Sequence, residues 1–183
     1  RYAWNVGNFG VSFQLILLFL CFFAGYVASE PLCGIYLHPG EFTDTTLSSE
    51  EREARIDAAL DSIHDCGFTT IIPYANTTSG NAYWPGTDLK MATPDEWDIL
   101  EALARKARER GLKVMPALCV LSSGHDSPTG ILESHGDWAL RDGNGKSIGW
   151  ISPANEEAQA WVVHLVEQLM RHIAPDGIML DYM

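Results

Sequence analysis

The feature that most constrains the fold is a repeated alternation of short apolar runs with amphipathic helix patterns after Glu30. Each run leads into a polar loop, and the first three loops lead into a helix pattern with one apolar stripe. Buried strands that alternate with helices form a parallel sheet whose outer face is covered by the helices. The apolar runs cover residues 34–38, 68–74, 112–121 and 177–182.

Three helices are predicted between these runs, each from its own start signal. The first begins after Ser48, which has Glu51 three residues later, the spacing of a capping box. The second is expected to begin at 93–96 (TPDE), where a capping residue, a proline and two acids stand in the favoured order. The third is expected to begin at 152–153. Residues 122–151 carry turn residues throughout and are predicted to be a long loop.

The segments that follow the apolar runs contain no glycine-rich phosphate-binding loop. The first run is followed by residues 38–42 (HPGEF), which match neither GxGxxG nor a P-loop, so a nucleotide site has little support. An open doubly wound sheet and a closed barrel both fit the alternation. Four units amount to about half of a (β/α)8 barrel, which needs about 250 residues. We therefore expect residues 30–183 to be the N-terminal half of a parallel α/β TIM barrel, truncated after about four β/α units.

An uncharged apolar stretch precedes this region. Residues 9–28 carry no charge over about twenty positions, which is long enough for a helix to span a bilayer. The small residues in Val27-Ala28-Ser29 stand where a signal peptidase would cut. We expect residues 1–29 to be a signal peptide or a membrane anchor, with a buried core helix as the third alternative. Either of the first two predicts an exported protein that is secreted, periplasmic or attached to a membrane through residues 9–28.

Charge and cysteine content limit the partners. The chain has 24 acidic and 12 basic residues, a formal net charge of -12, which argues against nucleic-acid binding. The cysteines show no CxxC or Cys/His spacing for a metal, and no cofactor is expected. Cys33 precedes the first run and Cys66 precedes the second, at the same end of a parallel sheet. In an exported protein they could form a disulfide, or they are two small buried thiols.

The last run ends on a carboxylate. Residues 175–182 (PDGIMLDY) open with a turn signal and continue as an apolar strand up to Asp181. Because strand side chains alternate between faces, Asp181 lies opposite the helix-facing Ile178 and Leu180. Asp181 should therefore face the mouth of the barrel, where catalytic groups collect.

Residues 150–161 and 175–182, with the loop at His135 and Trp138, resemble the glycosyl-hydrolase-like family 10 barrels, and more broadly the alpha-amylase-type glycoside hydrolases. The resemblance implies retaining hydrolysis of a poly- or oligosaccharide, with Asp181 as the nucleophile. It also implies a general acid on later strands and an arginine shortly after Tyr182, neither of which this sequence contains. The fragment alone is therefore expected to be inactive.

Aromatic and imidazole side chains near the strand ends are candidates for contact with a sugar. Structural roles remain open for several of them: a turn histidine for His38, loop packing for Trp84, and the bracing of a long loop for His135 and Trp138. Asn76 begins an N-glycosylation sequon on a loop. The substrate-binding candidates are His38, Tyr74, Trp84, His135, Trp138 and Tyr182.

Two other functions are compatible with the sequence. The first is a non-catalytic carbohydrate-binding or surface protein that keeps the barrel but lacks the acid. The second is a metal-dependent amidohydrolase-type barrel, which the absence of an HxH pair on the first run disfavours.

Overall fold

The computed structural model describes residues 32–93 and 95–183, so the predicted leader at residues 1–29 and its apolar helix lie outside the described residues. No helix in these two ranges is long and apolar enough to cross a membrane. The helices are α2 (Ser49–Asp65), α3 (Ile99–Glu109) and α4 (Glu156–Ile173), with short 3-10 turns η1 (Pro39–Phe42), η2 (Gly130–Glu133) and η3 (Gly136–Trp138). The strands are β1 (Gly34–Leu37), β2 (Thr70–Pro73), β3 (Lys113–Val114), β4 (Ala117–Cys119), β5 (Ser122–His125), β6 (Ala139–Arg141), β7 (Ser147–Ile151) and β8 (Met179–Asp181).

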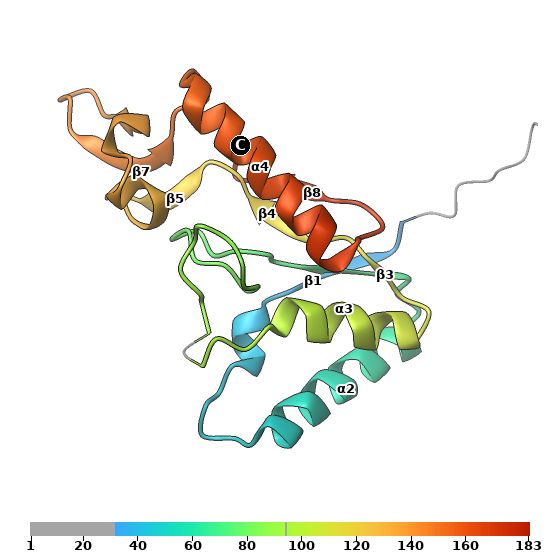
Figure 1. Ribbon diagram of the computed structural model, residues 1–183. Coiled ribbons are helices and arrows are strands. Elements are labelled where there is room, and N and C mark those ends of the chain that lie inside the picture. The colour runs from blue at the N-terminus through green and yellow to red at the C-terminus, as the bar shows by residue number, and fades with distance from the viewer. Residues whose placement is uncertain (1–31, 94) are drawn as a thin grey trace, which may run out of the picture. The chain divides into compact units, whose positions relative to one another are not determined.

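The structure is a mixed α/β fold built on parallel strands (Figure 1). β1 pairs with β2 and β2 with β3, while β4 pairs with β8, all of them in parallel. A parallel bridge between Tyr74 and Ala117 joins the two groups. The strands therefore lie side by side in the order in which they occur along the chain. This is the order of strands in a barrel wall. In doubly wound folds, by contrast, the order of the parallel strands reverses at one point within the sheet.

The third strand is interrupted, in contrast to the single run predicted over residues 112–121. It divides into β3 and β4 at Met115-Pro116. The Met115 N–H still donates to the Ile71 carbonyl at 3.0 Å. The next residue, Pro116, has no N–H and cannot continue the ladder. The neighbouring strand is nevertheless held, because the Pro116 carbonyl accepts from the Met179 N–H at 2.9 Å.

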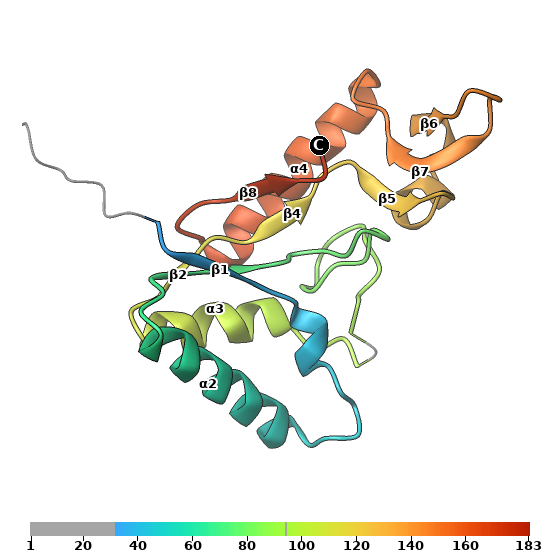
Figure 2. The same ribbon diagram turned by 180° about the vertical axis from the view of Figure 1, so that it is seen from behind.

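Helices cover one face of the parallel strands, as Figure 2 shows from the strand side. Ile71, Val114 and Leu118 point to this face and are fully buried in the hydrophobic core. Leu103 of α3 and Leu169 of α4 are buried in the same core. The opposite face carries the alternate residues of each strand, and the candidate site lies at its carboxyl end.

The first helix begins as predicted, whereas the other two begin later. Ser48 and Glu51 form a capping box at the start of α2. α3 begins at Ile99, where the Asp98 carboxylate accepts from the Glu101 N–H at 3.0 Å. Asn155 caps α4 in the same way, three residues after the predicted start. Asp and Asn are preferred caps, so several adequate caps close together make the sequence signal ambiguous.

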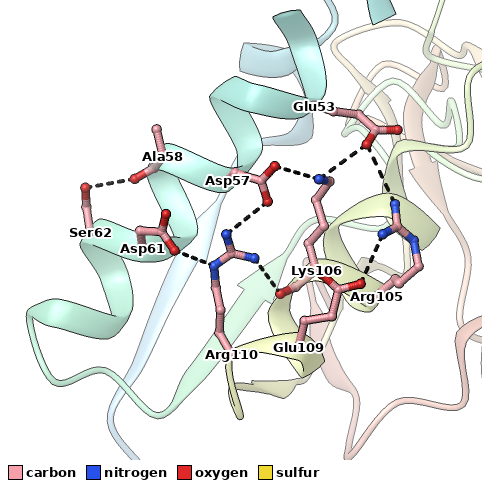
Figure 3. A network of polar contacts seen from close by, with 9 residues as sticks. All are labelled: Glu53, Asp57, Ala58, Asp61, Ser62, Arg105, Lys106, Glu109 and Arg110. Carbon is pink, nitrogen blue, oxygen red and sulfur yellow. Dashed lines mark hydrogen bonds and ion pairs between the residues drawn. The ribbon is translucent and has the colours of Figure 1, made fainter. Parts of the chain in front are cut away.

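A network of ion pairs joins α2 to α3 (Figure 3). Lys106 is only 8% exposed, and its Nζ lies 2.7 Å from Asp57 and 3.3 Å from Glu53. Arg110 binds the other oxygen of Asp57 at 3.0 Å and Asp61 at 2.6 Å. The carboxylates on one helix therefore neutralise the nearly buried cation on the other, which fixes the register between the two helices.

The predicted long loop at 122–151 instead contains an antiparallel sheet of order β5-β7-β6. It is tied to the end of the third strand, because the Ile151 N–H donates to the Leu121 carbonyl at 2.8 Å. Figure 1 and Figure 2 both show this sheet at the end of the parallel strands where β4 and β8 finish. The insertion is therefore an ordered wall next to the candidate site.

Candidate functional site

Asp181 is the last residue of β8, at the carboxyl end of the parallel strands, and its side chain is half-buried. Its Oδ1 accepts from the backbone N–H of Tyr182 at 2.8 Å. Its Oδ2 accepts from the hydroxyl of Tyr74 at 3.4 Å. Tyr74 directly follows β2, so the contact joins the ends of the second and fourth parallel strands. Both carboxylate oxygens are thus oriented by donors from this chain.

Tyr74 is suited to act as a permanent donor to this carboxylate. Burial, together with the negative charge of Asp181, raises the pKa of Tyr74 from 10.0 to about 12. The phenol therefore keeps its proton throughout the physiological range. Its ring also packs against Tyr36 of β1 and His38, which directly follows that strand, with ring centroids 5.5 Å from Tyr36 and 4.8 Å from His38.

Cys119 is the strand neighbour of Asp181, in direct register with it across β4 and β8. The residue is 2% exposed, and its Sγ lies 3.5 Å from the Asn76 carbonyl. Burial, followed by the charge of Asp181, raises the pKa of the Cys119 thiol from 9.0 to about 12. The thiol is therefore protonated and poorly nucleophilic, and it serves as an apolar floor under the carboxylate.

The side chain of Asn76 fixes the backbone of Cys119, a role that the sequence did not reveal. Its Oδ1 accepts from the Cys119 N–H at 2.8 Å, and its Nδ2 donates to the Cys119 carbonyl at 3.1 Å. The side chain is 2% exposed, so the amide is not available as a glycosylation acceptor in the folded chain. Asn76 instead links the loop after β2 to β4. The only sequence signal was its place directly after a strand, and the sequon suggested a different role.

A cavity of about 250 Å³ opens beside Asp181. Asp181 is not among the residues that line the cavity, but its carboxylate accepts hydrogen bonds from two of them, the Tyr74 hydroxyl and the Tyr182 N–H. His38 borders the cavity and is exposed, as the prediction of a substrate contact requires. The full lining is His38, Tyr74, Asn76, Thr77, Thr78, Tyr83, Cys119 and Tyr182.

Three of the six substrate-binding candidates lie elsewhere, which corrects the sequence-based interpretation. Trp84 is 1% exposed and belongs to the hydrophobic core, so it offers no face to a sugar. Trp138 is 4% exposed and packs 6.1 Å from Trp161 of α4, measured between ring centroids. His135 stacks on Trp138 at 4.0 Å. These side chains brace the inserted segment against α4, the structural alternative left open above.

The predicted disulfide is not formed in the structure. Cys33 and Cys66 are free, exposed thiols. Cys33 enters the sheet, where its carbonyl accepts from the Thr69 N–H at 2.9 Å, whereas Cys66 caps the end of α2 in the helix layer. Placement at the same end of the sheet therefore leaves the two residues in different layers. The alternative of two buried thiols is also incorrect for this pair.

The chemistry available at this site is that of one carboxylate, Asp181, next to a cavity lined by polar and aromatic side chains. No group of three or more His, Cys, Asp or Glu side chains suited to a metal occurs within residues 32–93 and 95–183. The cavity lining contains no carboxyl group of its own. Glycoside cleavage uses two carboxyl groups, about 5 Å apart for retention. The described part of the chain thus provides one of the two at this site.

The fold is shared with solved structures, several of which are glycosidases. It matches a hypothetical protein from Ruminiclostridium thermocellum (TM-score 0.56, 14% identity, 81% of this chain and 75% of that chain). It also matches alpha-L-fucosidase isoenzyme 2 from Paenibacillus thiaminolyticus (TM-score 0.60, 20% identity, 83% of this chain). A third match is a noncanonic maltogenic alpha-amylase from Thermotoga neapolitana (TM-score 0.55, 13% identity, 81% of this chain).

These matches cover only part of the two enzymes, because the chain spans 23% of the fucosidase and 38% of the amylase. No protein-family model matches the sequence, and no curated protein matches it significantly. The resemblance to family 10 therefore stays a prediction. At these identities the likeness concerns the fold alone: the described residues form a mixed α/β arrangement of the glycosidase type.

Proposed function

We propose that this chain is the N-terminal half of a (β/α)8-barrel glycoside hydrolase that cleaves a poly- or oligosaccharide with retention. The observation that carries the proposal is the position of Asp181 at the carboxyl end of the fourth parallel strand, with its Oδ2 held by Tyr74. In a barrel, catalytic groups project from this end of the strands. The likeness of the fold to a fucosidase and an amylase supports the same class of reaction.

The barrel itself is supported by surfaces that have no cover among the described residues. Leu180 of β8 lies on the helix-facing side of its strand yet is 44% exposed. Val163 of α4 is 59% exposed and borders an apolar groove of about 250 Å³ together with Leu121 and Ile151. A following β/α unit would pair with the free edge of β8 and cover these side chains.

In the proposed reaction, an Asp181 oxygen attacks the anomeric carbon and forms a carbon–oxygen bond while the glycosidic carbon–oxygen bond breaks. A general acid from a later strand donates a proton to the departing oxygen. That residue then takes a proton from water, which hydrolyses the glycosyl ester and frees Asp181. Tyr74 orients the attacking carboxylate, and Cys119 below it excludes water.

The predicted export is part of the proposal. The uncharged stretch at 9–28 is suited to carry the chain out of the cytoplasm or to attach it to a membrane, and the proposed substrate is then a poly- or oligosaccharide outside the cytoplasm. Fusion of residues 1–29 to a reporter enzyme that lacks its own signal tests this. The reporter should appear outside the cytoplasm, and reporter retained in the cytoplasm would contradict export.

The activity is tested on the complete protein with a panel of 4-nitrophenyl glycosides. Asp181→Asn should reduce turnover by at least about a thousandfold, and Asp181→Gly with added azide should yield a glycosyl azide of inverted configuration. Asp137→Asn, at an exposed site outside the cavity, is the matched control and should retain activity. Near-normal turnover by Asp181→Asn would reject the nucleophile.

A second candidate function is carbohydrate binding without turnover. The observation in its favour is that the cavity lining within the described residues provides no carboxyl group to act together with Asp181. This alternative predicts that the complete protein binds an oligosaccharide but hydrolyses none of the aryl glycosides. It also predicts that strands five to seven of the longer polypeptide lack a carboxylate at their carboxyl ends.

A further inference from the structure

Three aromatic rings from distant parts of the chain meet beside Asp181. His125 ends β5, Trp150 lies in β7, and Tyr182 follows β8. The centroid of the His125 ring lies 5.8 Å from the centroid of the Trp150 ring and 6.1 Å from the centroid of the Tyr182 ring. The ring centroids of Trp150 and Tyr182 are 6.3 Å apart. His125 and Trp150 belong to the segment that the sequence predicted as a loop, and nothing in the sequence pattern had assigned them a role.

The position of this aromatic cluster relative to Asp181 is set by backbone hydrogen bonds. The Tyr182 N–H binds Asp181 directly, and the Tyr182 carbonyl accepts from the Leu121 N–H at 3.1 Å. The Leu121 carbonyl in turn accepts from the N–H of Ile151, the residue after Trp150, at 2.8 Å. A continuous ladder thus connects the carboxylate with β7. One member of the cluster, Tyr182, also lines the cavity beside Tyr74.

The backbone around the cluster is built for close approach. A Cβ added to Gly149 would collide with the backbone of Gly124 and with the His125 nitrogen, so only glycine lets β5 and β7 come together here. His125 and Tyr182 both have left-handed backbone conformations, with φ of 54° and 55°. Such strain in non-glycine residues is costly and concentrates at ligand sites.

The cluster is also held from the other side. The Gly124 N–H and the Ser122 hydroxyl both donate to the Thr78 carbonyl at 2.9 Å. Thr78 lines the cavity beside Asp181, so the same loop supports both features. Even so, the rings are accessible to a ligand: His125 is exposed, and Trp150 and Tyr182 are half-buried.

We propose that His125, Trp150 and Tyr182 form a binding site for a second, neutral sugar ring of the substrate, next to the ring that reacts at Asp181. This inference rests on the proposed carbohydrate substrate. Fixed aromatic faces take up the apolar C–H face of a sugar ring at low entropic cost. Nucleobases also stack on such rings, but the net charge of -12 disfavours a polyanion. The substrate is therefore a chain of at least two sugars.

The test uses the complete protein and compares short with long neutral sugars. The probes are glucose, fucose, maltotetraose, cellotetraose and 2′-fucosyllactose, with calorimetric titration and tryptophan fluorescence as readouts. Trp150→Ala should weaken the affinity for the oligosaccharide that binds best about tenfold. The affinity for the corresponding monosaccharide should stay unchanged. Trp150→Phe should restore most of the affinity, and His125→Ala should give a smaller loss. Leu140→Ala, an exposed apolar residue of the same inserted sheet, is the matched control and should bind like the parent.

The outcomes separate this inference from the proposed function. If Trp150→Ala binds every probe as the parent does, or loses mono- and oligosaccharide equally while its circular dichroism is unchanged, the second-ring site is overturned. Absence of binding to every oligosaccharide by the parent overturns it as well. If Asp181→Asn hydrolyses normally while the length-dependent loss in Trp150→Ala persists, the nucleophile is wrong and the second-ring site stands.

Discussion

The hydroxyl of Tyr74 lies 3.4 Å from Oδ2 of Asp181, although 107 positions separate the two residues in the sequence. Across the third strand, Tyr74 is aligned through Ala117 with Met179, two residues before Asp181, so the Tyr74 side chain reaches the carboxylate from the neighbouring strand end. It converts a strand-end carboxylate into an oriented one. Five predictions follow from this site and from the helix layer that supports it.

Removal of the Tyr74 hydroxyl should lower activity without preventing folding. In the complete protein, Tyr74→Phe is expected to reduce kcat about tenfold with little change in KM, because one donor to the attacking carboxylate is lost. Tyr36→Phe changes an exposed neighbour of the same strand face and should leave kcat unaltered. Equal rates for both variants and the parent would show that Tyr74 does not orient Asp181.

The raised pKa of Tyr74 predicts a loss of stability at high pH. In the unfolded chain the phenol titrates near its ordinary value of 10.0, whereas in the folded chain its pKa is about 12. The folded state thus holds a proton that the unfolded state releases, so the free energy of unfolding should fall as the pH rises from about 10 to 12. Urea unfolding over this range should show a shallower fall for Tyr74→Phe. If the unfolding free energies of the parent and of Tyr74→Phe fell equally steeply with pH, the raised pKa of Tyr74 would be contradicted.

Thiol labelling should separate Cys119 from the two exposed cysteines. With iodoacetamide at pH 8, Cys33 and Cys66 should be alkylated within minutes, and Cys119 only after unfolding in urea, because its thiol is buried and its pKa is raised to about 12. Peptide mass spectrometry identifies each site. A Cys33–Cys66 disulfide peptide in the non-reduced digest would instead support the bridge predicted from the sequence. Rapid labelling of Cys119 would show that the site opens to solvent.

Loss of the Asn76 amide should be costly for stability. Asn76→Ala leaves the buried N–H and carbonyl of Cys119 without partners, which should destabilise the fold by about 2–4 kcal/mol. Urea unfolding monitored by tryptophan fluorescence measures this. Asn144→Ala, at an exposed turn in the inserted sheet, should change stability by less than about 0.5 kcal/mol. A similar midpoint for both variants would show that Asn76 does not secure β4.

The ion pairs between α2 and α3 should make the free energy of unfolding depend on pH in the acidic range. The hydrogen bond from Lys106 lowers the pKa of Asp57, so the stabilisation is present above the ordinary value of 3.8 and is lost as the pH falls through the lowered folded value. At neutral pH, Asp57→Asn should cost about 1–2 kcal/mol, because Asp57 is partly exposed and Glu53 still neutralises Lys106.

Asp88→Asn is the control for this acid dependence, since Asp88 is exposed and forms no ion pair with any side chain of residues 32–93 or 95–183. The difference in unfolding free energy between Asp57→Asn and the parent should shrink below pH 3.8. A difference that stays constant from pH 7 to pH 2 would contradict the lowered pKa.

Periodicity predicted the parallel strands and their helices because both patterns are local. Ile56, Leu60 and Ile63 repeat at helical spacing and are buried, and the capping box at Ser48 forms as expected. The placement of Asp181 on the face opposite the helices also follows from simple alternation along one strand. In these cases a few neighbouring residues carry all the information that the structure uses.

The errors concern residues whose environment depends on distant parts of the chain. Trp84 and Trp138 were proposed to contact a sugar because aromatics in loops often do, yet the burial of a large ring is decided by what packs on it. The sheet formed by β5, β6 and β7 was hidden by its glycines and short strands. Asn76 and Cys119 pair across 43 positions, a contact that no local pattern reveals.

The burial of Asn76 sets an order of events for any secretory pathway that modifies asparagine. An oligosaccharide transferred to this amide during translocation would have to be accommodated where the third strand closes against its neighbour, and the folded chain has no space for it. Production in a glycosylating host should therefore yield two populations: unmodified molecules that reach the native state and modified molecules that quality control retains. Expression in a bacterium, or a Thr78→Ala variant that removes the acceptor motif, would avoid that loss.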